Sequence, residues 1–416
     1  MSAVAVWLGL AALIASVMAR PHGSGPVVGA ALALAIASLG GTVGADDLGL
    51  AIAAQWRAYV TLAAVMTMTS AAERLGLLER LAGWIEPRTR GPVRYAFFVT
   101  FALSALAAAV LSNDAAVLLL TPAVLALLRT VYPRRNPKFL VPFAFAVFAG
   151  AGVAPFVISN PMNLIFADHV GLGFNAYAAT MIPVAVASWL ATYAMLARCF
   201  RGELADDSPA LGAWPAPPPL APGARAVLWT IASVLALYPI VSFAGAPVWP
   251  VALAGAVVCL GASASAGATP RALAGGVTWN VFPFLAAVYV LALGLERTGV
   301  VEHLARLYDT SPMPTATIGA TSALGSAVLN NHPMSVLDAF ALDRMHDPSL
   351  RHAFAALIGG DLGPRLLPVG SLASLLWFDV LHRHGVRVRV RDFVRVGVAI
   401  TAPVLLVSLL ALWWVR

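Results

Sequence analysis

The sequence predicts an all-α, multi-pass (polytopic) membrane protein made of two inverted repeats, with about 10 transmembrane helices, two re-entrant helical hairpins and helices broken at the midplane. Three observations lead to this prediction: the composition, a segment that occurs twice, and polar clusters that interrupt apolar stretches. Hydrophobic residues make up 60% of the chain, charged residues 11%, and the mean hydropathy is +0.84. Such a chain cannot present a normal water-facing surface, so we expect it in a lipid bilayer.

Apolar stretches long enough to cross a bilayer recur along the chain. We expect spans at 2–19, 26–45, 54–72, 140–158, 176–197, 226–243, 248–266, 277–295 and 396–414, with a further helix over about 352–380. The first stretch has no basic flank before it and Arg20 after it, which indicates a retained helix and not a cleaved signal peptide.

Residues 56–84 recur at 279–307 with most apolar positions in register. Apolar matches are common in a chain rich in Ala, Leu and Val, so the polar and aromatic matches carry the argument. They are Trp56 with Trp279, Glu73 with Glu296, Arg74 with Arg297 and Gly76 with Gly299. We therefore expect a first repeat over 1–200 and a second over 225–416. In membrane transporters such repeats build a substrate site where they meet at the bilayer midplane.

Basic residues in short loops predict the orientation of each repeat. Arginines between Glu73 and Arg94, and between Arg129 and Lys138, put those loops in the cytoplasm, whereas residues 169–175 contain no Lys or Arg and are expected outside. The matching loop of the second repeat is basic and is therefore expected in the cytoplasm, so the second repeat has the opposite orientation. This loop holds Arg383, Arg387, Arg389, Arg391 and Arg395. Residues 201–224 are polar and Pro-rich, as in a cytoplasmic linker. The net charge of +7 thus reflects membrane orientation and not nucleic-acid binding.

Two segments are too long for one span and have polar centres: about 94–129, with Ser112-Asn113-Asp114, and about 313–344, with Asn330-Asn331-His332-Pro333. The charges flanking each segment place both its ends on one side, so we expect re-entrant hairpins that enter from opposite sides. Gly and Pro interrupt two further stretches, and we expect broken helices over about 140–168 and 352–380. Irregular backbone at that depth is stable only when it is buried in protein or lines a cavity, which favours a binding site.

The polar residues at these four interruptions are the candidate substrate-binding residues: Asn113, Asn160, Asn163, Asn331, Gly370 and Ser371. Asn113 aligns with Asn331, and Asn160 with Ser371, across the repeat. Asn and Ser supply neutral donors and acceptors, while Gly and Pro free backbone groups at half-helix ends. The alternative is that these side chains form only interhelical hydrogen bonds.

Asp114, Asp361 and His332 are the candidate proton-coupling residues. A carboxylate inside a membrane is costly and usually marks an ion or proton path, and histidine titrates near neutral pH. The alternatives are an ion pair of Asp361 with Arg365 and a structural role for His332 at a hairpin tip. The two cysteines do not have the spacing of a metal site or a disulfide, so we expect neither a metal nor a cofactor. The sequence contains no nucleophile-base arrangement, so we do not expect an enzyme.

Four segments resemble a known family: 111–122, 158–168, 330–331 and above all 360–373, with Gly360-Asp361-Leu362-Gly363-Pro364 and Gly370-Ser371-Leu372-Ala373. They are similar to the bacterial arsenite permeases, the arsenical pump membrane proteins of the ion transporter superfamily. The resemblance covers nearly the whole chain from about residue 25. It implies inner-membrane export of arsenite or antimonite, as the undissociated hydroxide, in exchange for protons. The resemblance also allows a cytoplasmic arsenical ATPase as a partner.

Three residues depart from that family's pattern. Gly150 stands where these permeases usually carry Asp, His332 replaces an apolar residue, and Gly360 replaces a small thiol residue. Because this chain has only Cys199 and Cys259, trivalent arsenic must be held by hydrogen bonds and not by three thiolates. The alternatives are a sodium/proton antiporter or a carboxylate or oxyanion carrier on the same architecture, and, from other classes, a passive channel or a membrane enzyme.

Overall fold

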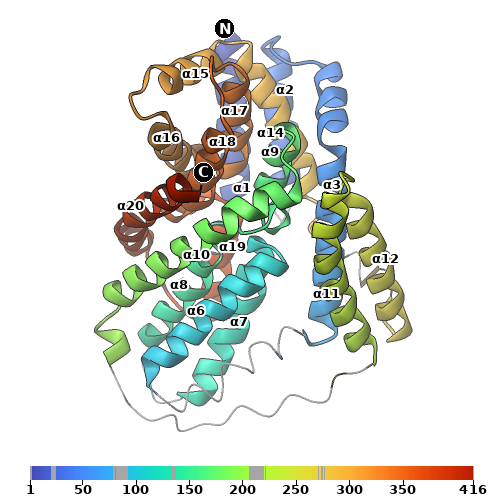
Figure 1. Cartoon of the computed structure of the whole chain (residues 1–416), viewed down its shortest axis with the longest axis vertical. Helices are drawn as coiled ribbons and strands as arrows, with labels where there is room; N and C mark the ends of the chain where they lie inside the picture. The colour runs from blue at the N-terminus through green and yellow to red at the C-terminus, as the bar shows by residue number, and fades with distance from the viewer. Residues whose placement is uncertain are drawn as a thin grey trace.

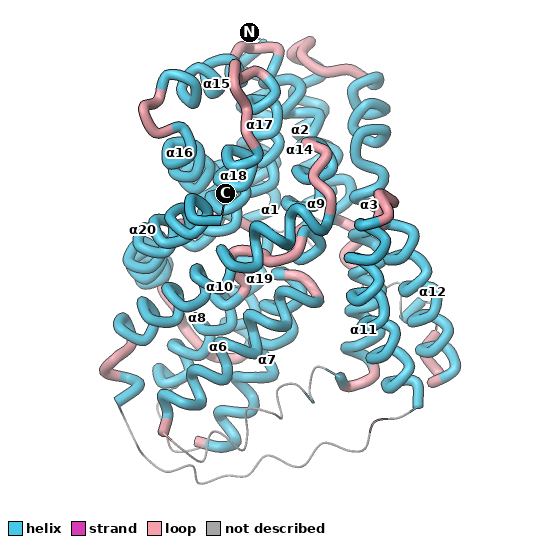
Figure 2. The backbone as a smooth tube through the Cα atoms, in the orientation of Figure 1, coloured by secondary structure: helices cyan, strands magenta, loops and turns pink. Residues whose placement is uncertain are grey.

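The computed structural model describes residues 2–19, 25–77, 80, 92–132, 137–205, 220, 222–269, 271–272, 275 and 277–415. Within these ranges every regular element is a helix, and helices joined by loops make up the whole drawn backbone (Figure 2). The predicted all-α membrane architecture is confirmed. Arg88, Arg90, Arg134, Arg135 and most of the predicted linker 201–224 lie outside the described residues.

The described helices follow one another along the chain as Figure 1 shows. They are α1 (Ser2–Ala19), α2 (Gly25–Leu39), α3 (Ala45–Arg74), α6 (Val93–Val110), α7 (Asn113–Val131), α8 (Leu140–Gly150), α9 (Pro161–His169), α10 (Phe174–Cys199), α11 (Pro222–Phe243), α12 (Trp249–Ser265), α14 (Val281–Glu296), α15 (Val300–Thr310), α16 (Pro314–Leu329), α17 (Asn331–Asp343), α18 (Leu350–Leu362), α19 (Leu372–Arg383) and α20 (Val390–Val415). Six of the described helices are long and apolar enough to cross a membrane singly, and α14 and α15, which meet at an angle of 76°, are together apolar and long enough for one more.

The polypeptide is not helical between α8 and α9, where the chain carries Gly152 and Pro155. A short 3-10 turn, η3 (Val157–Ser159), precedes Asn160, whose extended backbone (φ −144°) suits a residue before proline. Pro161 then begins α9 at a position where its missing N–H costs nothing. The apolar stretch 140–158 is therefore not one continuous helix, because Gly and Pro release the backbone from the helical ladder, and the break lies within the broken helix predicted over about 140–168.

A second interruption with the same order of parts lies between α18 and α19. Two 3-10 turns, η5 (Gly363–Arg365) and η6 (Pro368–Gly370), are followed by Ser371 in extended conformation (φ −151°). The Ser371 hydroxyl accepts a hydrogen bond from the Ser374 N–H at the start of α19 and thus caps that helix. Each interruption therefore exposes the end of one helix and the start of the next.

Two helix pairs reach toward these interruptions from opposite ends of the molecule. In Figure 1 the α6–α7 pair comes from below and the α16–α17 pair from above. The turn of the first pair is at Leu111 and Ser112, and the turn of the second is at Asn330. The description of these pairs as re-entrant, and of the two halves as inverted repeats, stays a prediction.

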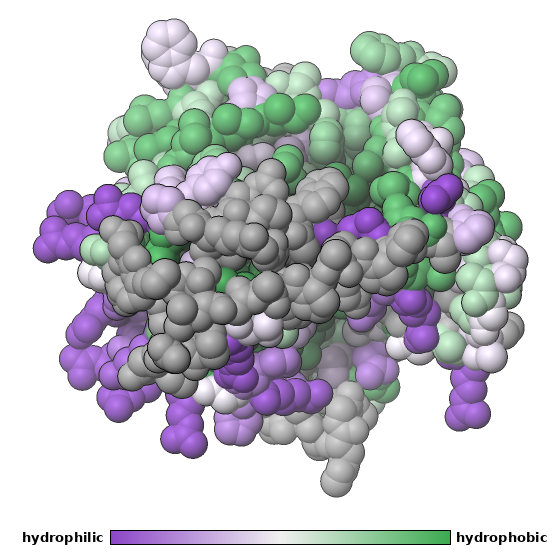
Figure 3. All heavy atoms as spheres, turned by 90° about the horizontal axis from the view of Figure 1, so that it is seen from below, coloured by the Kyte–Doolittle hydropathy of each residue, from purple (hydrophilic) through white to green (hydrophobic). Residues whose placement is uncertain are grey.

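The exterior combines apolar and basic side chains in a pattern that suits a bilayer. Large apolar residues such as Trp229, Phe243 and Leu190 are exposed, as expected for side chains that face lipid. Seen from below, hydrophilic side chains lie beside apolar ones (Figure 3). Arg94 at the start of α6 and Arg129 at the end of α7 lie at this lower end, which we expect to face the cytoplasm.

Helix α20 packs against α10 and against the η5 turn, and a glycine makes the second contact possible. A Cβ atom on Gly397 would lie 1.8 Å from the carbonyl oxygen of Arg365. Backbone occupies that space, so a side chain of any size forces α20 and η5 apart.

We expect Gly397→Ala to lower the melting temperature in detergent, because overpacking of this kind costs about 1–3 kcal/mol. The matched control is Gly261→Ala in α12, where nothing lies within 4 Å of the added atom. That variant should be neutral or slightly more stable, since Ala is favoured over Gly in helices by up to about 1 kcal/mol. Equal melting temperatures for the two variants would contradict the close approach of α20 to η5.

Candidate transport site

Asp361 is a buried carboxylate held by three neutral donors. It lies one residue before the end of α18 and is 6% exposed. Its Oδ1 accepts a hydrogen bond from Asn160 Nδ2 at 2.7 Å, and its Oδ2 accepts from Asn163 Nδ2 at 3.0 Å. The backbone N–H of Ala154 donates to Oδ2 at 2.9 Å. Ala154 and Asn160 come from the α8–α9 interruption and Asn163 from the first turn of α9, some 200 residues earlier in the chain. We call Asp361 with these donors the Asp361 cage.

Local sequence explains why both amides face this carboxylate. The Asn160 side chain caps α9: its Oδ1 accepts from the N–H of Met162 at 3.2 Å, which leaves Nδ2 directed outward to Asp361. Asn163 follows three residues later and shares that helix face. The carboxylate therefore also lies at the N-terminus of α9, where the partial positive charge of the helix favours an anion.

Tyr177 of α10 extends this network. Its hydroxyl accepts a hydrogen bond from Asn163 Nδ2 at 2.7 Å and donates to the Ala154 carbonyl at 3.1 Å. The side chain is fully buried. Sequence reasoning missed Tyr177, because a single tyrosine in an apolar helix carries no pattern, and it missed Ala154, because the contact uses only backbone.

Arg365 lies near Asp361 without pairing with it. The guanidinium is buried, and it donates to the Ala149 carbonyl at 2.5 Å and to the Thr192 hydroxyl at 3.1 Å. Arg365 in η5 follows Asp361 of α18 by four residues, and both side chains are buried. A direct ion pair between these two residues, the alternative considered for Asp361, is thus not what the structure shows.

Each hairpin turn contacts the interruption in its own half through an asparagine amide. Asn113 Nδ2 donates to the Gly152 carbonyl at 3.1 Å, and Asn330 Nδ2 donates to the Val369 carbonyl at 3.1 Å. Asn330 also caps α17 by accepting from the His332 N–H, and its backbone is left-handed, with φ at 83°. Such a backbone is strained for a residue other than glycine and is characteristic of functional sites. Asn330, which was not among the candidates, is therefore the counterpart of Asn113 in this contact.

Some of the predicted residues are buried near the second interruption and do not contact Asp361. The Oδ1 atom of Asn331 and the Nε2 atom of His332 are buried without a partner among the described residues. The Ser371 hydroxyl bonds the Ser374 hydroxyl at 2.8 Å. A Cβ on Gly370 would lie 2.6 Å from Pro364 Cα, so this glycine permits close packing of backbone.

Asp114 occupies the first turn of α7 and is partly exposed. None of the hydrogen bonds or ion pairs among the described residues joins it to Asp361. The predicted residues thus form two groups: Asn113, Asn160, Asn163 and Asp361 at the first interruption, and Asn331, His332, Gly370 and Ser371 at the second.

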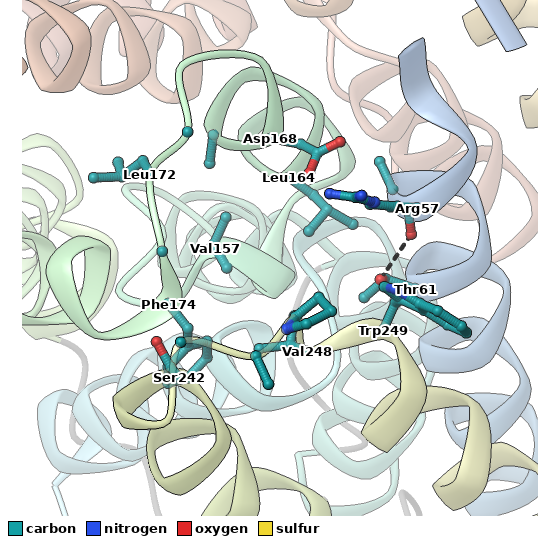
Figure 4. A pocket seen from close by; sticks show the side chains of 17 residues that line it. Arg57, Thr61, Val157, Leu164, Asp168, Leu172, Phe174, Ser242, Val248 and Trp249 are labelled. Atoms are coloured by element: carbon teal, nitrogen blue, oxygen red, sulfur yellow. Dashed lines mark hydrogen bonds between the residues drawn. The ribbon is translucent and has the colours of Figure 1, made fainter. Parts of the chain in front are cut away.

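A cleft of about 400 Å³ opens on the other side of α9. Its walls come from α3, α9 and the loop that joins α11 to α12, and Arg57 and Asp168 extend into it from facing sides (Figure 4). Leu164 lines the cleft, whereas its neighbour Asn163 faces Asp361, so α9 separates the two spaces. Phe174, another lining residue, stacks on Phe156 at 5.7 Å. None of the predicted site residues lines this cleft.

Interrupted helices around a buried carboxylate, within a bundle of apolar spans, are typical of the membrane transporter class. The sequence model of one family, described as arsenical pump membrane protein, matches residues 4–415. The chain therefore belongs to the arsenical pump membrane protein family, and it is a multi-pass protein of the bacterial inner membrane.

Individual relatives agree with this assignment. A protein of Escherichia coli (strain K12) described as an arsenical pump membrane protein is 29% identical over 410 residues, which cover 96% of each chain. Among solved structures, the Alcanivorax borkumensis YdaH transporter matches with a TM-score of 0.58 at 15% identity, over 88% of this chain and 87% of that one. The structure of Neisseria gonorrhoeae MtrF, described as illuminating a class of antimetabolite efflux pumps, matches with a TM-score of 0.55 at 14% identity, over 85% of this chain and 80% of that one. These two structures share the fold.

Proposed function

We propose that this chain exports arsenite and antimonite from the cytoplasm in exchange for protons. The observation that carries the proposal is the Asp361 cage, in which a buried carboxylate accepts hydrogen bonds from two side-chain amides and one backbone N–H. Such an arrangement suits a small neutral polyhydroxyl solute and a proton that compete for the same carboxylate.

The chemistry of the substrate fits these groups. Undissociated arsenite carries three hydroxyls that both donate and accept, and its neutrality avoids the large cost of moving an ion out of water. Its hydroxyls would donate to the Asp361 carboxylate and accept from Asn160 and Asn163. Thiol capture has no place here, since Cys199 lies at the end of α10 and Cys259 in α12.

Exchange follows from competition at Asp361. The ionised carboxylate accepts a hydroxyl of arsenite, and protonation removes that acceptor and releases the substrate. A proton taken up outside and released inside then drives arsenite outward. Because arsenite is neutral, each cycle moves positive charge into the cell, so both the pH gradient and the membrane potential should drive export.

Two further features complete the proposed mechanism. The cleft beside α9 would give one route to the site, and the stacked rings of Phe156 and Phe174 lie at its wall. The repeats, 1–200 and 225–416, would form inverted halves, with a hairpin-bearing unit that moves against the rest.

The test is arsenite uptake by everted membrane vesicles from an expressing strain that lacks other arsenite pumps. We expect accumulation with an imposed pH gradient alone, without ATP, and its loss when nigericin collapses that gradient. Accumulation that requires ATP and the cytoplasmic arsenical ATPase would contradict proton exchange. Sodium-dependent proton movement without arsenite uptake would favour the sodium/proton alternative, and uptake of labelled carboxylates in its place would favour the anion carrier.

A further inference from the structure

A second carboxylate, remote from the Asp361 cage, is buried in the α16–α17 hairpin. Asp338 of α17 is 1% exposed, and its Oδ1 accepts a hydrogen bond from the Tyr308 hydroxyl at 2.5 Å. Tyr308 belongs to α15 and is itself fully buried. No ion pair among the described residues involves Asp338. A carboxylate so deep and without a cation is costly unless a proton neutralises it.

Several charged groups on or next to the helices that pack against α17 form ion pairs with residues other than Asp338. His169 of α9 binds Asp343, Arg344 binds Glu296 and Glu302, and Arg297 binds Asp47. The remaining titratable or charged groups of α9, α14, α15 and α18 are Asp168, Tyr289, His303, Arg306, Asp309, Arg351, His352 and Asp361. Among the described residues Asp338 accepts a hydrogen bond from Tyr308 and has no ion pair with any of these groups, so proton uptake would neutralise it.

Buried polar groups also lie on α16. Ser322 and Ser326 lie one helical turn apart on α16, which packs against both α15 and α17, and the Ser322 hydroxyl donates to the Ile318 carbonyl at 2.7 Å. Both serines are fully buried, and the Ser326 hydroxyl has no hydrogen-bond partner among the described residues. That hydroxyl oxygen lies 3.9 Å from the place where a Cβ on Gly360 would stand, and Gly360 immediately precedes Asp361.

One face of α17 is also polar over this length. Asn331, Ser335 and Asp338 are buried and share one face at positions i, i+4 and i+7. A stripe of hydroxyls and amides on two adjoining helices is unusual in an apolar bundle, where such groups are retained for hydrogen bonding or for transport.

We propose that Asp338 is a second proton-binding carboxylate of this transporter, remote from Asp361 and held by Tyr308. The inference rests on the proposed proton exchange and adds to it one further proton per arsenite. In each cycle Asp338 takes up one proton on one side and releases it on the other, and Tyr308 donates its hydrogen bond to the ionised form.

The test compares arsenite accumulation by wild-type and Asp338→Asn protein in proteoliposomes, at an imposed gradient of about one pH unit and zero membrane potential. Asn keeps an acceptor for Tyr308 but cannot bind a proton. Loss of one coupled proton should lower steady-state accumulation about tenfold, since one proton across one pH unit is worth about 1.4 kcal/mol. Asp343→Asn is the matched control, because that exposed carboxylate on the same helix binds His169.

The Tyr308→Phe variant distinguishes proton binding by Asp338 from a purely structural hydrogen bond between Tyr308 and Asp338. It removes the donor and keeps the carboxylate, so the pH at half-maximal uptake should rise, because the ionised form has lost its hydrogen bond. Wild-type accumulation by Asp338→Asn, or a Tyr308→Phe variant that changes only the melting temperature, would overturn the inference while leaving arsenite export intact. Absence of arsenite accumulation by the wild-type protein would instead refute the proposed function.

Discussion

Vesicles that contain the Asp361→Asn variant should fail to accumulate arsenite when a pH gradient is imposed. Asn offers a single acceptor oxygen where the carboxylate accepts three hydrogen bonds, so at least one of the N–H groups of Asn160, Asn163 and Ala154 loses its partner. Leaving such a donor buried costs about 1–3 kcal/mol. The larger effect is on coupling, because an amide binds no proton and cannot alternate between proton and substrate.

The measurement is net arsenite uptake as a function of external pH, with protein amount and melting temperature recorded for each variant. Asp379→Asn serves as a control, since that carboxylate pairs with Arg383 near the end of α19 and is partly exposed. We expect it to transport like the wild type. Uptake by Asp361→Asn with wild-type magnitude and wild-type pH dependence would remove Asp361 from the coupling mechanism.

Arg365→Met should destabilise the protein and abolish transport. The substitution leaves the Ala149 carbonyl and the Thr192 hydroxyl without their buried donor, and it removes the positive charge near Asp361. Removal of one of two neighbouring buried charges typically lowers the free energy of unfolding by about 3–5 kcal/mol. Because Arg365 connects the start of the second interruption to the end of α8, both halves should loosen around the site.

Thermal unfolding in detergent measures this effect, with Arg383→Met as the control. The Arg383 side chain is 73% exposed and pairs with Asp379 on the surface of α19, and such pairs contribute about 0–1 kcal/mol. The Arg365→Met, Asp361→Asn double variant should be more stable than the sum of the two single effects predicts, since each single variant leaves the other charge uncompensated. Strict additivity, or equal melting temperatures for Arg365→Met and Arg383→Met, would show that the two buried charges do not interact.

Part of the site was predictable because its residues interrupt a strong pattern. Asn160, Asn163 and Asp361 stand out in apolar stretches, and Gly152, Pro155 and Pro161 mark where a helix must end. These are local properties of the chain, since a proline removes a backbone donor and an intramembrane carboxylate is costly whatever surrounds it.

The partners of these residues were not predictable. Asn330 and not Asn331 binds the second interruption, because the backbone turn at φ 83° directs the side chain of the first asparagine toward Val369. Arg365 binds Ala149 and not its near neighbour Asp361, because η5 carries it toward the end of α8. Tyr177 and Tyr308 join carboxylate networks from helices whose sequences give no sign of it.

The sequence by itself determined that this protein is helical, lies in a membrane, and breaks its helices at four polar points. Composition, proline placement and the burial cost of charge act on each segment separately, so they can be interpreted along the chain. The tertiary structure alone decided that the first interruption supplies donors to a carboxylate of the second half, and that Asp338 is buried against Tyr308. Those contacts join residues 30 to about 200 positions apart, and only packing brings them within hydrogen-bonding distance.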